Sequence, residues 1–197
     1  MYFRDVIMPA PHMRLLASDA LLIVDVQRDF CSGGALSIAG ADEIIPTIND
    51  LIKQAIEAKA LVIASRDWHP PDHSSFHAFG GIWPTHCVQG SDGAKFHAAL
   101  RVPGDALIIT TGQTVDKDQY SAFDATGLAN ELRRRGVKRV LICGLAQDVC
   151  VRATALDAVE AGFETHLRLS ATRAIVPAHG EEAVAEMVRA GAIVEGS

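Results

Sequence analysis

The run ALLIVD, at residues 20–25, holds five consecutive apolar residues and ends in a carboxylate. Such uninterrupted runs are typical of strands buried on both faces of a parallel sheet, because no face is left for polar side chains. Similar apolar runs recur along the chain. We expect strands at residues 20–24, 61–64, 106–110, 140–143, 163–169 and 192–194.

Amphipathic segments separate these runs. Residues 42–58 carry isoleucine and leucine at helical spacing, and further helices are predicted at 124–135, 148–161 and 181–190. Asp124 is the expected N-cap of the second helix, and Gly136 stands where that helix should stop. The alternation predicts an α/β fold with three layers, in which helices cover both faces of a central, mostly parallel sheet of about six strands.

Length and charge narrow the class of protein. The 197 residues suit a single domain, 1–197, with residues 1–18 as an N-terminal extension. A net charge of -6 argues against a nucleic-acid partner. We see no secretory signal and no apolar run long enough for a membrane span. Without an export signal, the four cysteines are expected to be free thiols in a reducing compartment, the cytoplasm.

Polar residues follow several of the predicted strands, at the edge of the sheet where ligands bind in open α/β folds. Asp25 comes directly after an apolar run, so burial should raise its pKa and suit it to general base work. A structural role, in which Asp25 caps the following turn, is an equal alternative. The segment 68–96 is rich in His, Pro, Gly and Ser, and a loop of this length is usually functional.

A metal site is the second candidate. Asp67 and His69 are two residues apart at a strand end, where an extended chain points both side chains to one face. His86 could complete the set from the loop, and His73 is an additional candidate ligand. One carboxylate and two imidazoles suit zinc, iron(II) or manganese. The alternative is that these loop histidines are solvated or hydrogen-bonded.

The third candidate is a nucleophile. Cys150 is expected in the first turn of the helix that follows the strand at 140–143. There the helix dipole and the backbone N–H groups stabilise a thiolate, and the same N–H groups could hold a tetrahedral oxyanion. A thiol opposite a buried aspartate suits acyl transfer. The alternative is a small buried apolar residue, which is how we interpret Cys143 within its strand.

Taken together, these segments resemble the isochorismatase-like cysteine hydrolases, most closely the nicotinamidases and pyrazinamidases. The matching stretches occur in the family's order from about residue 20 to the end of the chain. They are DVQRDF at 25–30 with GGAL at 33–36, RDWHP at 66–70, WPTHCVQG at 83–90, DQYSAF at 118–123, and GLA at 144–146 through CVRAT at 150–154.

The resemblance implies that Cys150 is the nucleophile and Asp25 its acid/base partner. It implies that a divalent metal, zinc first with iron or manganese as alternatives, is held by Asp67, His69 and His86. The implied reaction hydrolyses nicotinamide to nicotinate and ammonia through a thioester, a step of NAD salvage. The implied partners are a small amide substrate and further copies of the chain in a homo-oligomer.

The resemblance also implies a cis peptide bond before Ala146, which would aim the backbone N–H groups of Ala146 and Cys150 into an oxyanion hole. A flat aromatic ring would be enclosed by Phe30, Trp68 and Tyr120. Cys31 and Cys87 match positions without a catalytic role in the family.

One position departs from the family pattern. A catalytic Lys followed by Gly is expected nine residues before the Tyr-Ser pair, and this chain has Thr111-Gly112 there. Without that ammonium, we expect Asp25 to have a higher pKa and Cys150 to be harder to activate. Lys117 of the same loop is a candidate substitute. The departure keeps two alternatives open: a hydrolase of another small amide, ureide or vinyl ether, and a catalytically weak ligand-binding relative.

Overall fold

The computed structural model describes residues 12–195, and these contain one sheet of six parallel strands. The strands stand in the order β3-β2-β1-β4-β5-β6, and every neighbouring pair is parallel. The predicted class, a mostly parallel sheet of about six strands, is confirmed. The strands are β1 (Asp19–Val24), β2 (Leu61–Asp67), β3 (Leu107–Thr111), β4 (Arg139–Leu145), β5 (Glu164–Arg173) and β6 (Ile193–Glu195).

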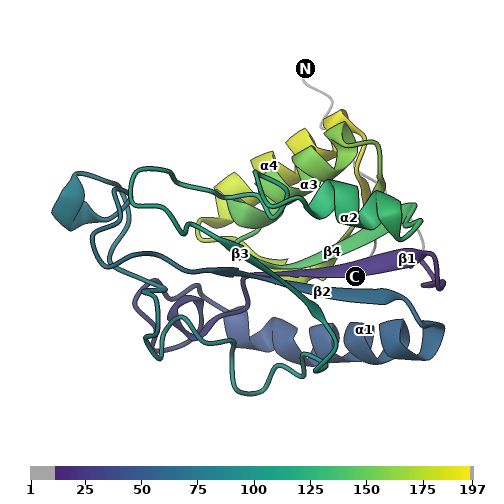
Figure 1. Cartoon of the computed structure of the whole chain (residues 1–197), viewed down its shortest axis with the longest axis horizontal. Helices are drawn as coiled ribbons and strands as arrows, with labels where there is room; N and C mark the ends of the chain where they lie inside the picture. The colour runs from purple at the N-terminus through teal and green to yellow at the C-terminus, as the bar shows by residue number, and fades with distance from the viewer. Residues whose placement is uncertain (1–11, 196–197) are drawn as a thin grey trace.

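Helices cover both faces of the sheet, which gives the predicted three layers (Figure 1). One face carries α1 (Ile45–Ala58), and the other carries α2 (Leu128–Arg134), α3 (Cys150–Glu160) and α4 (Pro177–Ala190). The chain places β2 and β3 on one side of β1 and β4 on the other. The order therefore reverses between β1 and β4, and ligands bind at such a switch point beyond the carboxyl ends of the strands.

The side chains of β1 explain why its sequence is apolar without interruption. Leu21 and Ile23 belong to the core beneath α1, whereas Leu22 and Val24 belong to the core beneath α3 and α4. All four are buried. Successive residues of a strand point to opposite faces, and here both faces are covered.

The start of α2 differs from the sequence prediction. Asp124 does not cap α2, since that helix begins at Leu128 after Gly127, whose φ of 78° is left-handed. The Asp124 carboxylate instead pairs with Lys117 at 2.8 Å. Gly136, with φ of 73°, does follow the end of α2 as expected for a helix stop.

Short 3-10 helices complete the chain. They are η1 (Arg28–Phe30), η2 (Ala41–Ile44), which leads into α1, and η3 (His77–Phe79), which lies on the loop that extends from the sheet (Figure 1). The described part of the predicted N-terminal extension packs against the sheet: Met13 is buried and its N–H donates to the Glu195 carboxylate (2.9 Å). Residues 1–11 of that extension lie outside the described residues. No helix in the described range 12–195 is long and apolar enough to span a membrane.

Candidate active site and metal centre

Four neighbouring strands end side by side at one edge of the sheet, and three of them lead to polar side chains. Asp25 follows β1, Asp67 ends β2, Thr111 ends β3, and Ala146 follows β4. Cys150 opens α3 beside them. A pocket lies here, at the switch point of the sheet, and its wall consists of Phe30, Leu36, Asp67, His69, Trp83, His86, Asp118, Tyr120, Ala146, Val149, Cys150 and Ile175.

Asp25 and Cys150 are brought together as a buried pair. Asp25 is 2% exposed and Cys150 is 6% exposed, and a carboxylate oxygen of Asp25 lies within 4.8 Å of Cys150 Sγ. Burial raises the pKa of Asp25 to about 8, and the charge of Asp67 adds to this, although the Ser65 hydroxyl donates to Asp25 Oδ1 at 2.7 Å. Burial and the charge of Asp25 also raise the pKa of the Cys150 thiol. A carboxyl group with a pKa near neutrality can both accept and return a proton.

The backbone conformation of Asp25 ends strand β1. Asp25 has a left-handed φ of 47°, which residues other than glycine seldom adopt. The Gln27 N–H donates to the Asp25 carbonyl at 2.8 Å, which closes a three-residue turn. The turn keeps Asp25 at the edge of the sheet where β2 and β4 also end.

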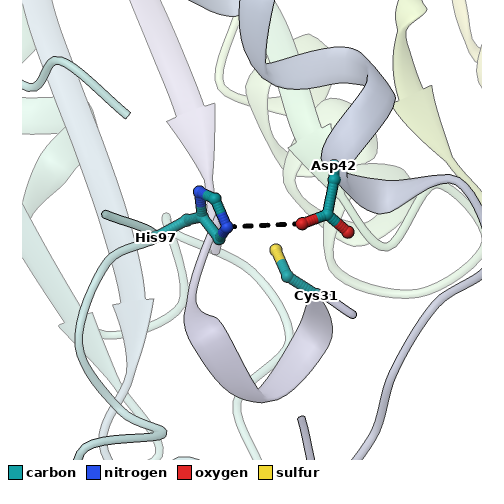
Figure 2. A group of neighbouring side chains, drawn as sticks. All are labelled: Cys31, Asp42 and His97. Carbon is teal, nitrogen blue, oxygen red and sulfur yellow. Dashed lines mark ion pairs between the residues drawn. The ribbon is translucent and has the colours of Figure 1, made fainter. Parts of the chain in front are cut away.

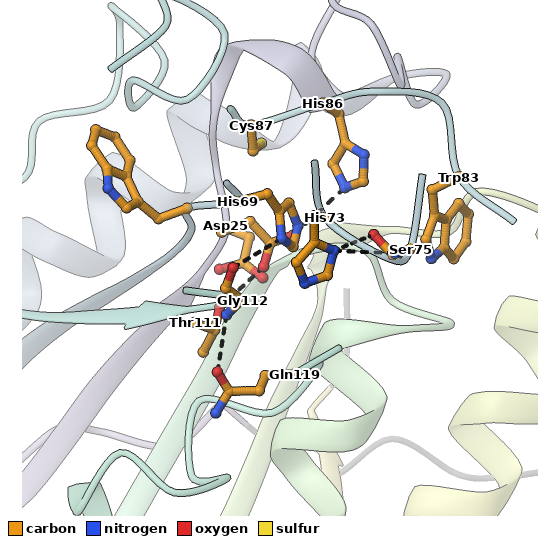
Figure 3. Close-up of polar contacts among 12 residues, drawn as sticks. Asp25, His69, His73, Ser75, Trp83, His86, Cys87, Thr111, Gly112 and Gln119 are labelled. Atoms are coloured by element: carbon orange, nitrogen blue, oxygen red, sulfur yellow. Dashed lines mark hydrogen bonds and ion pairs between the residues drawn. The ribbon is translucent and has the colours of Figure 1, made fainter. Parts of the chain in front are cut away.

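Asp67, His69 and His86 form a buried group whose ligand atoms all lie within 4.8 Å of one another. Figure 3 shows the two imidazoles of this group, His69 and His86. Asp67 Oδ2 is 3.6 Å from His69 Nε2 and 3.9 Å from His86 Nε2. His69 Nδ1 lies 3.2 Å from the Gly112 carbonyl, and His86 Nδ1 lies 2.7 Å from the Pro84 carbonyl.

These contacts decide the tautomers of the two imidazoles. A carbonyl only accepts hydrogen bonds, so both Nδ1 atoms carry a proton, and both Nε2 atoms face Asp67. Burial lowers the pKa of His86, which favours its neutral form. Burial opposes the charge of Asp67, but the hydrogen bond and charge of His69 outweigh it and lower the Asp67 pKa. Burial opposes the protonation of His69, but its hydrogen bond to Asp67 and the charge of that carboxylate outweigh burial and raise the His69 pKa. Both Nε2 atoms converge on the Asp67 carboxylate, so the residues present fit a divalent metal, which would take the place of a proton on His69 Nε2.

The structure does not bring His73 into this group. Its Nδ1 accepts from the Ser75 backbone N–H (3.3 Å) and contacts the Ser75 hydroxyl (2.7 Å), while Nε2 lies 3.2 Å from the Lys117 carbonyl. Nε2 therefore carries the proton and donates it. The ring packs against His69 with centroids 4.3 Å apart. His73 supports the neighbouring histidine and ties two loops together.

A second group, Cys31, Asp42 and His97, also has ligand atoms within 4.8 Å of one another (Figure 2). In this second group the histidine carries its proton on Nε2, the nitrogen that a metal would need. His97 Nδ1 accepts the Ala99 N–H (3.2 Å), so the proton sits on Nε2, which faces Asp42 Oδ1 at 3.3 Å. Burial, with the charge of Asp42, raises the pKa of the Cys31 thiol to about 12. This group is a hydrogen-bonded network rather than a preformed metal site.

The aromatic wall differs from the expectation at one residue. Phe30 and Tyr120 line the pocket, but Trp68 does not. Asp67 and His69 point into the site, and the residue between them on an extended chain points away. The Arg66 guanidinium lies over the Trp68 ring, 4.2 Å from its centroid.

The tryptophan that lines the pocket is Trp83, which the sequence analysis did not assign to the site. Trp83 lines the pocket, and its Nε1–H donates to the Tyr120 hydroxyl at 3.0 Å. Its position in the same motif as His86, three residues earlier, was the available signal. Asp118, which also lines the pocket, was quoted only as part of a motif.

Within residues 12–195, no ammonium takes the place of the family lysine. Thr111, 2% exposed, donates its hydroxyl to Asp67 Oδ1 at 3.0 Å. The Lys117 side chain is 51% exposed and pairs with Asp124. Among the residues that the structure describes, neither Lys nor Arg lines the pocket.

Two backbone donors face the pocket region. The peptide bond between Leu145 and Ala146 is cis, as the resemblance implied. Within residues 12–195 the N–H groups of Ala146 and Cys150 have no hydrogen-bond acceptor, and both residues line the pocket. Two free donors at the start of a helix are what an oxyanion hole requires.

Known proteins resemble the chain over most of its length. A family model described as isochorismatase domain matches residues 19–197. A nicotinamidase from Acinetobacter baylyi is 40% identical over 79% of this chain and 81% of its own length. The pyrazinamidase of Pyrococcus horikoshii in complex with zinc is 48% identical, with a TM-score of 0.88 over 91% of this chain and 99% of that chain. PnC1 from L. infantum in complex with nicotinate is 38% identical, with a TM-score of 0.84 over 95% of this chain and 96% of that chain.

Proposed function

Because this chain belongs to the isochorismatase family, we propose that it hydrolyses nicotinamide to nicotinate and ammonia. Its relatives make it a hydrolase of an amide C–N bond. The observation that carries the proposal is one pocket lined by Cys150 and by the group Asp67, His69 and His86, with Asp25 buried beside Cys150.

In the proposed reaction, Asp25 takes the proton of the Cys150 thiol and the thiolate attacks the amide carbonyl carbon. The C–S bond forms, and the N–H groups of Ala146 and Cys150 hold the oxyanion. Asp25 returns its proton to the leaving nitrogen, the C–N bond breaks, and ammonia departs. Water then gives a proton to Asp25 and adds to the thioester. The C–S bond breaks to release the acid, and the proton on Asp25 returns to the sulfur.

A divalent metal, with zinc as the first candidate and iron or manganese as alternatives, would be held by Asp67, His69 and His86 and would supply a Lewis acid that orients the pyridine nitrogen. The protein's own contribution is a flat slot. Phe30, Trp83 and Tyr120 offer aromatic surface for a planar ring. The described lining lacks Lys and Arg, which favours a neutral amide over a substrate that carries its own carboxylate.

Thr111 favours one alternative. Without an ammonium beside Asp25 the thiol is harder to ionise, so a more reactive small amide or ureide is the second candidate substrate. All four cysteines are free, which supports a reducing compartment, and we propose the cytoplasm as the location and NAD salvage as the role of the product acid.

The test is ammonia release from nicotinamide, pyrazinamide and a set of small ureides, with and without a chelator. Cys150→Ala should abolish release while retaining the metal. Cys143→Ala, a buried thiol on β4, is the matched control and should keep the activity. Full activity in Cys150→Ala would exclude the thioester route. No release from nicotinamide with any added metal would exclude the proposed substrate.

A further inference from the structure

We propose that Thr111 and Gly112, at the end of β3, are positioning residues that preset the two metal ligands Asp67 and His69. The inference rests on the proposed metal site. It goes beyond that site by assigning a role to the residue that replaces the family lysine: its hydroxyl acts on the metal ligand Asp67 rather than on the Asp25–Cys150 pair.

The Thr111 hydroxyl holds the outer oxygen of the Asp67 carboxylate. Thr111 Oγ1 is 3.0 Å from Asp67 Oδ1, while Oδ2 faces the His69 and His86 Nε2 atoms. Fixing Oδ1 therefore fixes the direction of Oδ2. Thr111 Oγ1 also lies 3.2 Å from the Arg66 carbonyl, but its one proton prefers the charged acceptor. Thr111 is buried, so water does not compete for this bond.

Gly112 holds the second ligand. Its carbonyl accepts the His69 Nδ1 proton (3.2 Å), which leaves Nε2 free for a metal. The backbone of Gly112 is left-handed, with φ of 64°, and a Cβ there would stand 2.4 Å from His69 Cε1. Only glycine lets the carbonyl approach the ring in this way. The Gly112 N–H donates to Gln119 Oε1 at 3.1 Å, and Figure 3 shows this chain of contacts from His69 through Gly112 to Gln119.

The rest of Asp67 is already fixed, so side-chain rotation is its remaining freedom. Its backbone N–H and carbonyl are both bound by the Gln27 side chain, each at 2.8 Å. The next peptide is tied to β3 by the Trp68 N–H, which donates to the Thr111 carbonyl at 3.0 Å. Among the described residues, the Thr111 hydroxyl bonds only to Asp67 and to the Arg66 carbonyl. It therefore acts through Asp67 and not on the reacting atoms.

The experiment titrates purified holoprotein with a chelator and measures the zinc that remains bound. Thr111→Val keeps the shape and removes the hydroxyl, so its zinc affinity should fall by about 10- to 100-fold, the usual effect of losing such a partner. Thr111→Ser keeps the donor and should stay close to wild type. Thr110→Val is the matched control, because the Thr110 hydroxyl contacts Arg66 Nε and not the metal group.

Circular dichroism and melting establish that each variant is folded, and Thr111→Ala replaces Thr111→Val if the valine does not fit. Zinc affinity equal to wild type in a folded Thr111→Val or Thr111→Ala protein would overturn the inference. Equal weakening in Thr111→Ser and Thr111→Val would overturn the role of the hydroxyl. If the wild-type protein retains no divalent metal, the proposed metal site itself is wrong, whereas ammonia release tests the proposed substrate separately.

Discussion

The Gln27 side chain clamps Asp67 by binding both of its backbone polar groups. Gln27 Oε1 accepts the Asp67 N–H and Gln27 Nε2 donates to the Asp67 carbonyl, both at 2.8 Å, and Nε2 also reaches the Ala94 carbonyl at 2.9 Å. Gln27 is fully buried. The first turn after β1 thus holds the last residue of β2, so the proposed acid/base residue Asp25 and the proposed metal ligand Asp67 are supported by the same turn.

The first prediction concerns this clamp. Gln27→Leu leaves the buried Asp67 N–H and carbonyl without partners, so the free energy of unfolding should fall by about 1–3 kcal/mol for the unpaired groups. Zinc retention should fall as well, because Asp67 gains backbone freedom. Urea unfolding and metal analysis measure the two effects. Gln89→Leu is the control, since exposed Gln89 makes a similar bond to the Trp68 carbonyl (3.0 Å) and should change little. A stable Gln27→Leu protein with full zinc content would contradict the clamp.

The strand ends were predictable because parallel strands end at a common edge. The apolar runs located β1, β2 and β4, and the topology rule then gathered Asp25, Asp67 and Cys150 without any knowledge of side-chain positions. The partner of each imidazole nitrogen was not predictable. Gly112 and Pro84 contribute carbonyls whose positions depend on loops with no periodic pattern.

The direction in which a side chain points was also not predictable from the sequence. Trp68 is adjacent to two candidate metal ligands and Trp83 is three residues from another, and only the backbone path shows which indole enters the pocket. Gln27 belongs to the DVQRDF motif at 25–30, yet its role depends on contact with Asp67, which lies 40 positions later in the sequence. Long-range polar contacts of this kind leave no local signature in one sequence.

The second prediction separates the two tryptophans. Trp83→Phe removes the N–H that binds the Tyr120 hydroxyl and shrinks the pocket wall, so the KM for the amide should rise more than kcat falls. Trp68→Phe should leave KM unchanged, because Trp68 lies outside the lining. Steady-state kinetics of both proteins on the same substrate make the comparison. A larger KM effect at Trp68 would mean that the pocket wall is assigned to the wrong indole.

The third prediction tests the contact of β1 with β4 at the switch point. Gly144 has φ of 114°, and a Cβ there would stand 2.1 Å from the Val24 carbonyl oxygen. Gly144→Ala must therefore push the two strands apart, with an expected loss of about 1–3 kcal/mol or more in unfolding free energy. Gly104→Ala is the control, because nothing lies within 4 Å of its Cβ position. Thermal melting of the two variants decides, and equal melting temperatures would refute the close approach.

The fourth prediction concerns a buried ionic network between the edge strand β6 and its neighbour β5. Glu195, fully buried on β6, lies 3.0 Å from His166 Nδ1 and 2.6 Å from Arg168 Nη2. The hydrogen bond with Glu195 raises the pKa of His166. Burial opposes the charge of Glu195, but the hydrogen bonds from His166 and Arg168 outweigh it and lower the Glu195 pKa. His166 Nε2 also contacts the Glu164 carboxylate at 2.8 Å.

The signs of these two shifts define a pH window for stability. A raised histidine pKa contributes stability in full below its unfolded value of about 6.5, and the contribution is lost as the pH rises through the folded value. A lowered glutamate pKa contributes above its unfolded value of about 4.3 and is lost as the pH falls. The network should therefore stabilise the fold most between about pH 4.3 and 6.5.

His166→Gln should consequently lose more unfolding free energy at about pH 6 than at about pH 8.5, because the contribution of the protonated histidine is complete below about pH 6.5 and declines as the pH rises through the raised folded pKa. Urea unfolding of both proteins at the two pH values measures this difference. His179→Gln, on the exposed side of α4, is the control and should track wild type at both. The same loss at both pH values would show that His166 contributes through packing alone, and the charge of Glu195 would then be balanced by Arg168 without it.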